Sequence, residues 1–198
     1  MKIDTSLPLE YSTEQNRMNI FGFWVFLGAE IMLFATLFTS YFIYENRIGS
    51  GPAGSEIFEI TPVLIETALL LTSSFTIGLA IHAMRINRPK AMLAFLAVTL
   101  LLGAGFLSVE IYEFIHYYHV SATLQTSAFT GILLTTLGTH GAHVAFGLFW
   151  GIFIFIQIKK HGLNAKTANK SFIFSLYWHF LDVMWIFIFS FIYLKGLM

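Results

Sequence analysis

Residues 175–189 read SLYWHFLDVMWIFIF and are almost entirely apolar or aromatic, as a helix surrounded by lipid requires. His179 and Asp182 interrupt this stretch three residues apart, which places both on one face of a helix. An ionisable side chain at the centre of a bilayer costs at least about 2.5–3.5 kcal/mol, so it should face protein or a polar cavity. The stretch therefore predicts a membrane-spanning helix with one lipid side and one protein side.

The whole chain has the composition of a membrane protein. Of its 198 residues, 57% are hydrophobic and only 11% are charged, whereas soluble domains average about 25% charged residues. The formal net charge is zero, so we expect no nucleic acid partner. The sequence contains no cysteine, which excludes disulfides and thiolate ligands. Its polar start does not have the pattern of a signal peptide.

Five long apolar segments follow a polar N-terminal tail, residues 1–17. Because each exceeds the length needed to cross a bilayer, we predict an all-α integral membrane bundle with a single five-helix domain in residues 18–198. The loop 45–60 contains three glycines and a proline, which predicts turns. The spans are expected at about 18–44, 62–84, 91–117, 128–158 and 171–194.

The basic residues predict the orientation of the chain. All Lys and Arg residues except Arg47 and Lys195 lie in the N-terminal tail, in the link 85–90 or in the link 159–170. Basic residues favour the cytoplasmic side, so we predict a cytoplasmic N-terminus and a C-terminus outside. Topology alone accounts for each basic residue, but those at the cytoplasmic helix ends are also candidates for binding lipid headgroups. These candidates are Arg85, Arg88, Lys159 and Lys160.

Ionisable side chains inside the predicted spans form the candidate functional set. They are Glu30, Glu66, Glu110, Glu113, His140, His143, His179 and Asp182. Three pairs have i, i+3 spacing, so the bundle interior is expected to be polar in places. Burial in a low dielectric favours the neutral form of a carboxyl group, which can then exchange protons. Glu110 and Glu113 are therefore candidates for a proton relay; the alternative is a neutral carboxyl hydrogen-bonded to a His or Tyr on a neighbouring helix.

His140 and His143 are also a candidate metal or haem pair, because two histidines one turn apart can share a metal ion. They cannot bind opposite faces of one haem, since both project from one side of a helix; a haem would need His179 or another histidine across the bundle. We favour the alternative that these imidazoles form hydrogen bonds between helices. The sequence has no GxSxG or HExxH motif. Its four prolines lie outside the span interiors, which argues against a carrier with broken helices.

Four motifs carry a family resemblance. In chain order they are GFWVFLGAE (22–30), GAGFLSVEIYEF (103–114), LGTHGAHVAFG (137–147) and the opening stretch, residues 175–189. Together they resemble subunit III of the haem–copper terminal oxidases, in its shorter five-helix form. The first loop and second span, GPAGSEIFEITPVLIETALLL (51–71), are most similar to the bacterial quinol oxidase branch of bo or aa type.

The resemblance implies a non-redox subunit of a quinol oxidase complex in a bacterial plasma membrane. That complex oxidises quinol, reduces oxygen to water and moves protons outward. Haems and copper are expected on subunit I, and this chain would carry no cofactor, metal or catalytic residue. It would contact subunit I, assemble with subunits II and IV, bind phospholipids and support proton uptake through its polar residues.

Three alternatives to this function stay open. The chain could be the five-helix subunit III of a bacterial cytochrome c oxidase. It could be an independent membrane cytochrome that uses His140, His143 and His179 directly. It could also be a stand-alone proton transporter centred on Glu110. An optical spectrum of the chain alone would test the second, and proton flux in liposomes would test the third.

Overall fold

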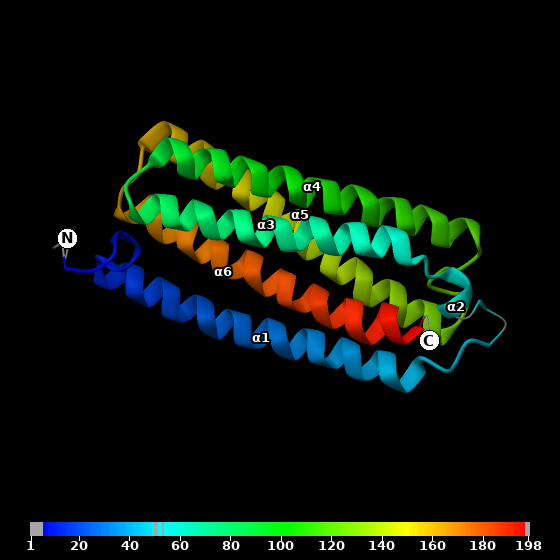
Figure 1. Cartoon of the computed structure of the whole chain (residues 1–198). Coiled ribbons are helices and arrows are strands. Elements are labelled where there is room, and N and C mark those ends of the chain that lie inside the picture. The colour runs from blue at the N-terminus through cyan, green and yellow to red at the C-terminus, as the bar shows by residue number, and fades with distance from the viewer. Residues whose placement is uncertain (1–5, 50, 53, 197–198) are drawn as a thin grey trace.

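Five long helices form one elongated bundle (Figure 1). The computed structural model describes residues 6–49, 51–52 and 54–196, and these contain helices but no strand. All five long helices are apolar and long enough to cross a membrane, so the predicted all-α five-helix fold is confirmed. The elements are η1 (Leu9–Tyr11), α1 (Glu14–Tyr44), α2 (Gly54–Ile57), α3 (Ile60–Arg85), α4 (Pro89–His119), α5 (Ala128–His161), α6 (Ala165–Ile188) and a π-helical extension, η2 (Phe189–Leu194).

The long helices extend past the predicted spans, most clearly where α1 and α6 begin. Thr13 and Asn164 cap these two helices, because their side-chain oxygens accept hydrogen bonds from backbone N–H groups of the first turn. The first turns of α1 and α6 are polar, so the hydrophobicity of the sequence did not indicate that the helices begin there. The loop expected to form turns also contains the short helix α2. Beside it, the ring of Phe58 packs 5.0 Å from that of Tyr193 in η2.

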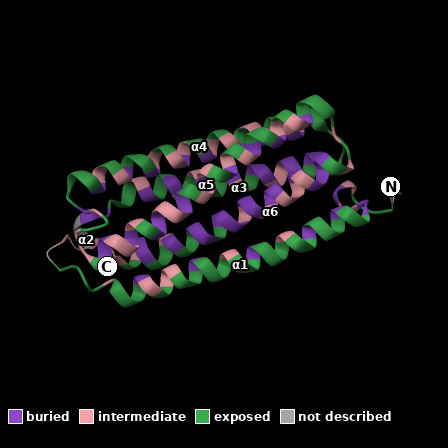
Figure 2. Ribbon diagram, turned by 180° about the vertical axis from the view of Figure 1, so that it is seen from behind, coloured by how far each residue is buried: buried purple, intermediate pink, exposed green. Residues whose placement is uncertain are grey.

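Helix α6 is the centre of the bundle. It lies against α1, α3 and α5, and Figure 2 shows it largely buried, whereas most of α1 is exposed. Trp178 of α6 is 1% exposed and occupies the space that two glycines leave free. A Cβ atom at Gly103 would lie 2.7 Å from the Trp178 ring, and one at Gly147 would lie 3.1 Å from it. Small residues thus allow close helix approach, as expected where lipid gives no hydrophobic drive.

The N-terminal tail packs against the bundle, although its sequence predicted no role for it. Glu10 in η1 is fully buried, and its Oε1 accepts hydrogen bonds from Nε and Nη2 of Arg85 at 2.9 and 2.8 Å. The amide of Asn169 donates to the backbone carbonyl of Glu10 at 3.1 Å. Tyr11 packs on Phe172 with 5.4 Å between ring centroids. These contacts tie the tail to α3 and α6.

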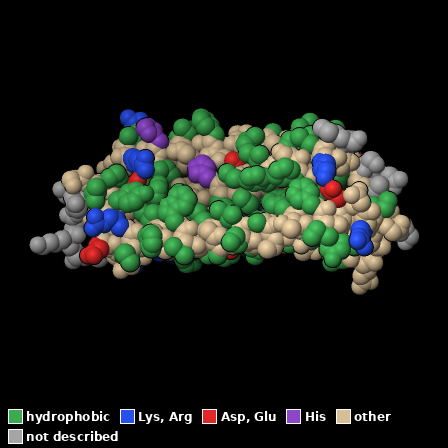
Figure 3. All heavy atoms as spheres, turned by 90° about the horizontal axis from the view of Figure 1, so that it is seen from below, with side chains coloured by type: hydrophobic (Ala, Val, Ile, Leu, Met, Phe, Trp, Pro, Cys, Tyr) green, Lys and Arg blue, Asp and Glu red, His purple; other side chains and the backbone are tan. Residues whose placement is uncertain are grey.

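The first and last described residues, 6 and 196, lie at opposite ends of the bundle, as an odd number of spans requires (Figure 1). Figure 3 shows Lys and Arg side chains near both ends of one face, with hydrophobic side chains covering most of its middle. This distribution fits helices that cross a bilayer. The cytoplasmic placement of the N-terminus stays a prediction from the basic residues.

Candidate functional site

Three glutamates from two helices meet inside the bundle, and we call them the carboxyl cluster. Glu66 lies on α3, and Glu110 and Glu113 lie one turn apart on α4; none is more than 4% exposed. Glu66 interacts electrostatically with both of the others. The helices α3 and α4 are antiparallel neighbours joined by a short link, so the two faces that carry these residues can meet.

Glu113 is held by two tyrosines. The hydroxyl of Tyr193 donates to Oε2 of Glu113 at 2.7 Å, and that of Tyr117 donates to the same oxygen at 3.3 Å. Both tyrosines are buried. This arrangement matches the alternative in which the carboxyl is hydrogen-bonded to tyrosine, and it fixes one end of the carboxyl cluster.

Glu66 and Glu110 differ from Glu113, because their four carboxyl oxygens are buried without a hydrogen-bond partner among the described residues. The carboxyl of Glu110 lies against Gly141 of α5, where a Cβ atom would overlap both of its oxygens. His140, the preceding residue, is fully buried, and neither ring nitrogen has a partner in the described chain. Its ring packs 5.5 Å from that of Trp185. Several hydrogen-bonding atoms are thus gathered in the interior without protein partners.

His143 lies one turn after His140, and both rings pack on Phe34, but His143 has polar partners that His140 lacks in the described chain. Its Nδ1 donates to the carbonyl of Thr139 at 2.6 Å, and its Nε2 lies 3.2 Å from Oε2 of Glu30 on α1. With Nδ1 protonated, one proton must lie between Nε2 and the carboxyl oxygen. Glu30 and His143 therefore form a hydrogen bond with each other across the interface of α1 and α5.

His179 pairs with a residue that sequence spacing did not indicate. Its Nδ1 lies 2.7 Å from Oγ of Ser74 on α3. Among the described side chains, no ion pair within 4.0 Å joins His179 to Asp182. Asp182 is 8% exposed and its Oδ1 has no hydrogen-bond partner in the described chain. The i, i+3 spacing placed both side chains on one face, where they interact electrostatically, but the hydrogen-bond partner of the His179 ring is Ser74 and not Asp182.

Comparison with known proteins identifies the chain. The family model for cytochrome c oxidase subunit III matches residues 11–197. Quinol oxidase subunit 3 from Bacillus spizizenii is 54% identical over 194 residues, which cover 98% of this chain and 95% of that protein. Cytochrome c oxidase subunit 3 from Bacillus sp. strain PS3 is 45% identical across 96% and 92% of the two chains. The chain belongs to the cytochrome c oxidase subunit III family.

This result confirms the resemblance drawn from the four motifs. The relatives are bacterial, and probable quinol oxidase subunit 3 from Staphylococcus aureus is also 42% identical over the whole length of this chain. With its five apolar helices, this member of the subunit III family is a multi-pass protein of the bacterial plasma membrane.

The four basic residues proposed to bind lipid headgroups in this subunit III chain do not share one environment. Arg85 is engaged with Glu10, whereas Arg88, Lys159 and Lys160 are exposed. Binding of lipid headgroups by these residues stays a prediction. Over the described residues, no group of three or more His, Cys, Asp or Glu side chains is placed to hold a metal ion.

Several residues of the site were missing from the sequence-based set. Tyr117 follows Glu113 by four residues, so helical spacing could have indicated their contact. Tyr193, Ser74 and Gly141 come from other helices, and no spacing rule connects them to their partners. The contacts between helices therefore had to come from the structure.

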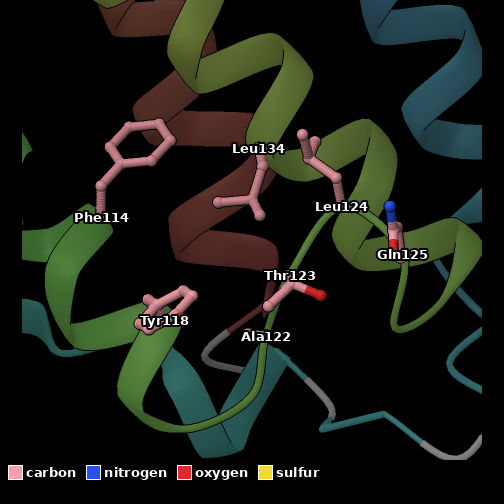
Figure 4. A pocket seen from close by; sticks show the side chains of 7 residues that line it. All are labelled: Phe114, Tyr118, Ala122, Thr123, Leu124, Gln125 and Leu134. Atoms are coloured by element: carbon pink, nitrogen blue, oxygen red, sulfur yellow. The ribbon is translucent and has the colours of Figure 1, made fainter.

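A surface pocket of about 470 Å³ lies where α4 ends and α5 begins (Figure 4). Its lining includes no member of the carboxyl cluster and none of the other candidate residues. The side chains that line it are Phe114, Tyr118, Ala122, Thr123, Leu124, Gln125 and Leu134.

Proposed function

We propose that this chain is subunit III of a terminal quinol oxidase, a complex that oxidises quinol and reduces oxygen to water. The observation that carries the proposal is the 54% identity to quinol oxidase subunit 3 from Bacillus spizizenii along nearly the whole chain. The second candidate, subunit III of a cytochrome c oxidase, is supported by the 45% identity to that protein of strain PS3. The higher identity favours the quinol branch.

In this proposal the chain is a non-redox partner. Haems and copper belong to subunit I, which this chain contacts and stabilises, and subunits II and IV and phospholipids complete the complex. A close-packed bundle with no broken transmembrane helix in its described part suits a stabilising subunit better than a moving carrier. The outward movement of protons would belong to the complex as a whole.

The carboxyl cluster supports a role in proton supply. Buried polar atoms without protein partners are commonly bridged by internal water. Glu66 and Glu110, which interact electrostatically, contribute four such atoms, and His140 on α5 contributes two more. Water between these groups would let a proton pass from one carboxyl to the next. Glu113 accepts hydrogen bonds from two tyrosines, so it would be the fixed last group on this proton path.

Purification of the tagged chain from its native membranes in mild detergent tests the proposed function. We expect a large haem-bearing subunit to co-purify and the preparation to consume oxygen with quinol as electron donor. Activity with reduced cytochrome c in place of quinol would favour the second candidate. A chain that purifies alone without haem would overturn both, and a haem spectrum from the chain alone would support an independent cytochrome.

We predict that Glu110→Ala leaves assembly largely intact but shortens the working life of the oxidase during turnover. The substitution breaks no hydrogen bond to the described chain, because neither carboxyl oxygen of Glu110 has a partner there. It removes a carboxyl that proton supply would use. The measurement is oxygen consumption over time, with haem content of the purified complex as the measure of assembly.

Glu113→Ala is the matched control on the same helix. It removes the carboxyl oxygen to which the hydroxyls of Tyr117 and Tyr193 donate, and each buried hydroxyl left unsatisfied costs about 1–3 kcal/mol. We therefore expect this variant to lower thermal stability more than Glu110→Ala does. Failure of the Glu110→Ala complex to assemble would assign that carboxyl a structural role and remove it from the relay.

A further inference from the structure

The carboxyl cluster lies much nearer to one end of the bundle than to the other. At 1.5 Å per residue, Glu66 is about 9 Å along the helix axis from the start of α3 and about 29 Å from its end. On the same scale, Glu113 is about 9 Å from the end of α4 and about 36 Å from its start. Both residues are therefore close to the end of the bundle that holds α2, which we call the α2 end (Figure 1). The N-terminal tail lies at the other end, the tail end.

An exposed acid–base pair lies beside the carboxyl cluster at the α2 end. Nε2 of His116 on α4 is 4.0 Å from Oε1 of Glu59, the residue that precedes α3, and their side chains are 37% and 62% exposed. Glu113 lies one turn before His116 on α4 and interacts electrostatically with both members of the pair. Groups that can carry protons thus extend from the solvent to the carboxyl cluster.

The inner carboxyls of the cluster need hydrogen-bond partners from outside the protein. Glu66 is fully buried and Glu110 is 4% exposed, and none of their four carboxyl oxygens has a partner in the described chain. Buried polar atoms in native proteins are nearly always hydrogen-bonded, and internal water commonly supplies the bond. Because lipid surrounds the middle of the bundle, such water must come from one of its two ends.

The interior between the carboxyl cluster and the tail end is closed to protons. Leu70 on α3 and Phe106 on α4 are buried one turn from the cluster on that side. The buried residues of α3 and α4 nearer the tail end are mostly apolar and include Ile77, Ala80, Met84, Met92 and Leu96. Three buried hydroxyls on that side donate to backbone carbonyls of their own helices; they belong to Ser73, Thr76 and Thr99. In α3 and α4, which are described throughout, no ionisable residue is buried there.

We propose that the carboxyl cluster exchanges protons with water at the α2 end, by way of Glu59 and His116, and not with water at the tail end. A proton passes from this pair to Glu113 and on through internal water to Glu110 and Glu66. Each step breaks one O–H or N–H bond and forms another. The inference deepens the proposed role in proton supply and rests on it, because it names the end of the bundle at which that role is carried out.

The predicted orientation then decides which aqueous phase is involved. With the N-terminus in the cytoplasm, as the basic residues predict, the α2 end faces the outside. The carboxyl cluster would then exchange protons with the phase into which the proposed complex moves them. This differs from proton uptake on the cytoplasmic side.

Infrared spectroscopy of the purified, intact complex tests the route. A protonated carboxyl has a C=O band that shifts when deuterium replaces its proton, so the rate of this shift in heavy water measures proton access. The part of the band that is lost in Glu110→Gln belongs to the carboxyl cluster. We expect the double variant Glu59→Gln/His116→Phe to slow the shift of that part by roughly tenfold or more, because it removes both titratable groups at the entrance. The Glu59 side chain makes no capping hydrogen bond to α3, so the variant keeps the helix start.

The matched control is the double variant Glu14→Gln/His82→Phe at the tail end. Glu14 is exposed in the first turn of α1, and His82 is exposed in the last turn of α3. We expect the wild-type rate from this variant. An unchanged rate in Glu59→Gln/His116→Phe, equal slowing in the control, or a band that Glu110→Gln does not alter would overturn the route. Quinol-dependent oxygen consumption of the same preparations tests the proposed function separately, and a preparation without a haem-bearing subunit would overturn that function and the route together.

Thiol labelling tests which phase the α2 end faces. The sequence contains no cysteine, so His116→Cys gives this chain its only thiol. We expect a membrane-impermeant maleimide, added to intact cells, to increase the mass of this chain by one label. Labelling only after the cells are opened would place the α2 end in the cytoplasm and contradict proton exchange with the outer phase.

Discussion

Trp178→Ala is expected to lower the free energy of unfolding of this chain by about 3–5 kcal/mol, the usual effect of emptying a buried tryptophan site. The ring is 1% exposed and packs against Gly103 and Gly147 on two different helices. Its Nε1 donates to Oγ of Ser73 at 2.8 Å, so the substitution also removes a buried hydrogen bond, although the Ser73 hydroxyl still donates to the carbonyl of Leu70. The two glycines have no side chains that could refill the space.

The measurement is the temperature at which the purified complex loses this chain, with the accumulation of the chain in membranes as a second readout. Trp24→Ala is the control, since Trp24 is 56% exposed on α1 and its loss leaves no cavity. Trp178→Phe keeps most of the volume and loses the hydrogen bond, so an intermediate effect is expected. Equal effects of Trp178→Ala and Trp24→Ala would show that α6 is not the packing centre.

Hydrophobicity alone was enough to predict the five spans, because lipid imposes the same length and composition on every crossing helix. Hydrophobicity was not enough to predict where the helices begin. The caps Thr13 and Asn164 start α1 and α6 in polar sequence, where hydropathy is uninformative. The docking of Glu10 on Arg85 joins residues far apart in the chain, and neither residue has a local pattern that indicates the other.

The candidate residues were predictable as a set, but their partners were not. Membrane spans contain few ionisable residues, so each one in the sequence was a reasonable candidate. Spacing of i, i+3 gave a shared face for His140 and His143, yet the structure places one beside Trp185 and the other beside Glu30. Partners on other helices depend on helix rotation and on which helices are neighbours. Both are set by small-residue contacts that sequence periodicity does not encode.

Gly141→Ala is expected to destabilise the chain by about 1–3 kcal/mol, the usual penalty for overpacking a filled site. Its new methyl group would overlap the carboxyl oxygens of Glu110, and that side chain is buried with little room to move. Gly138→Ala, one turn earlier on α5, is the control. Its methyl group would make an ordinary contact 3.7 Å from Phe114. Alanine also gains up to about 1 kcal/mol over glycine within a helix, so this variant should be neutral or stabilising.

A double substitution tells whether the carboxyl of Glu110 is the cause. If it is, Gly141→Ala should do little further harm in a chain that already carries Glu110→Ala, since the methyl group would enter the vacated space. The interaction energy between the two substitutions would then offset most of the effect of Gly141→Ala alone. Additive effects in the thermal stability of the complex would mean that the methyl group strikes the helix backbone instead. In that case the absence of a side chain at Gly141 serves helix packing and not the placement of the carboxyl cluster.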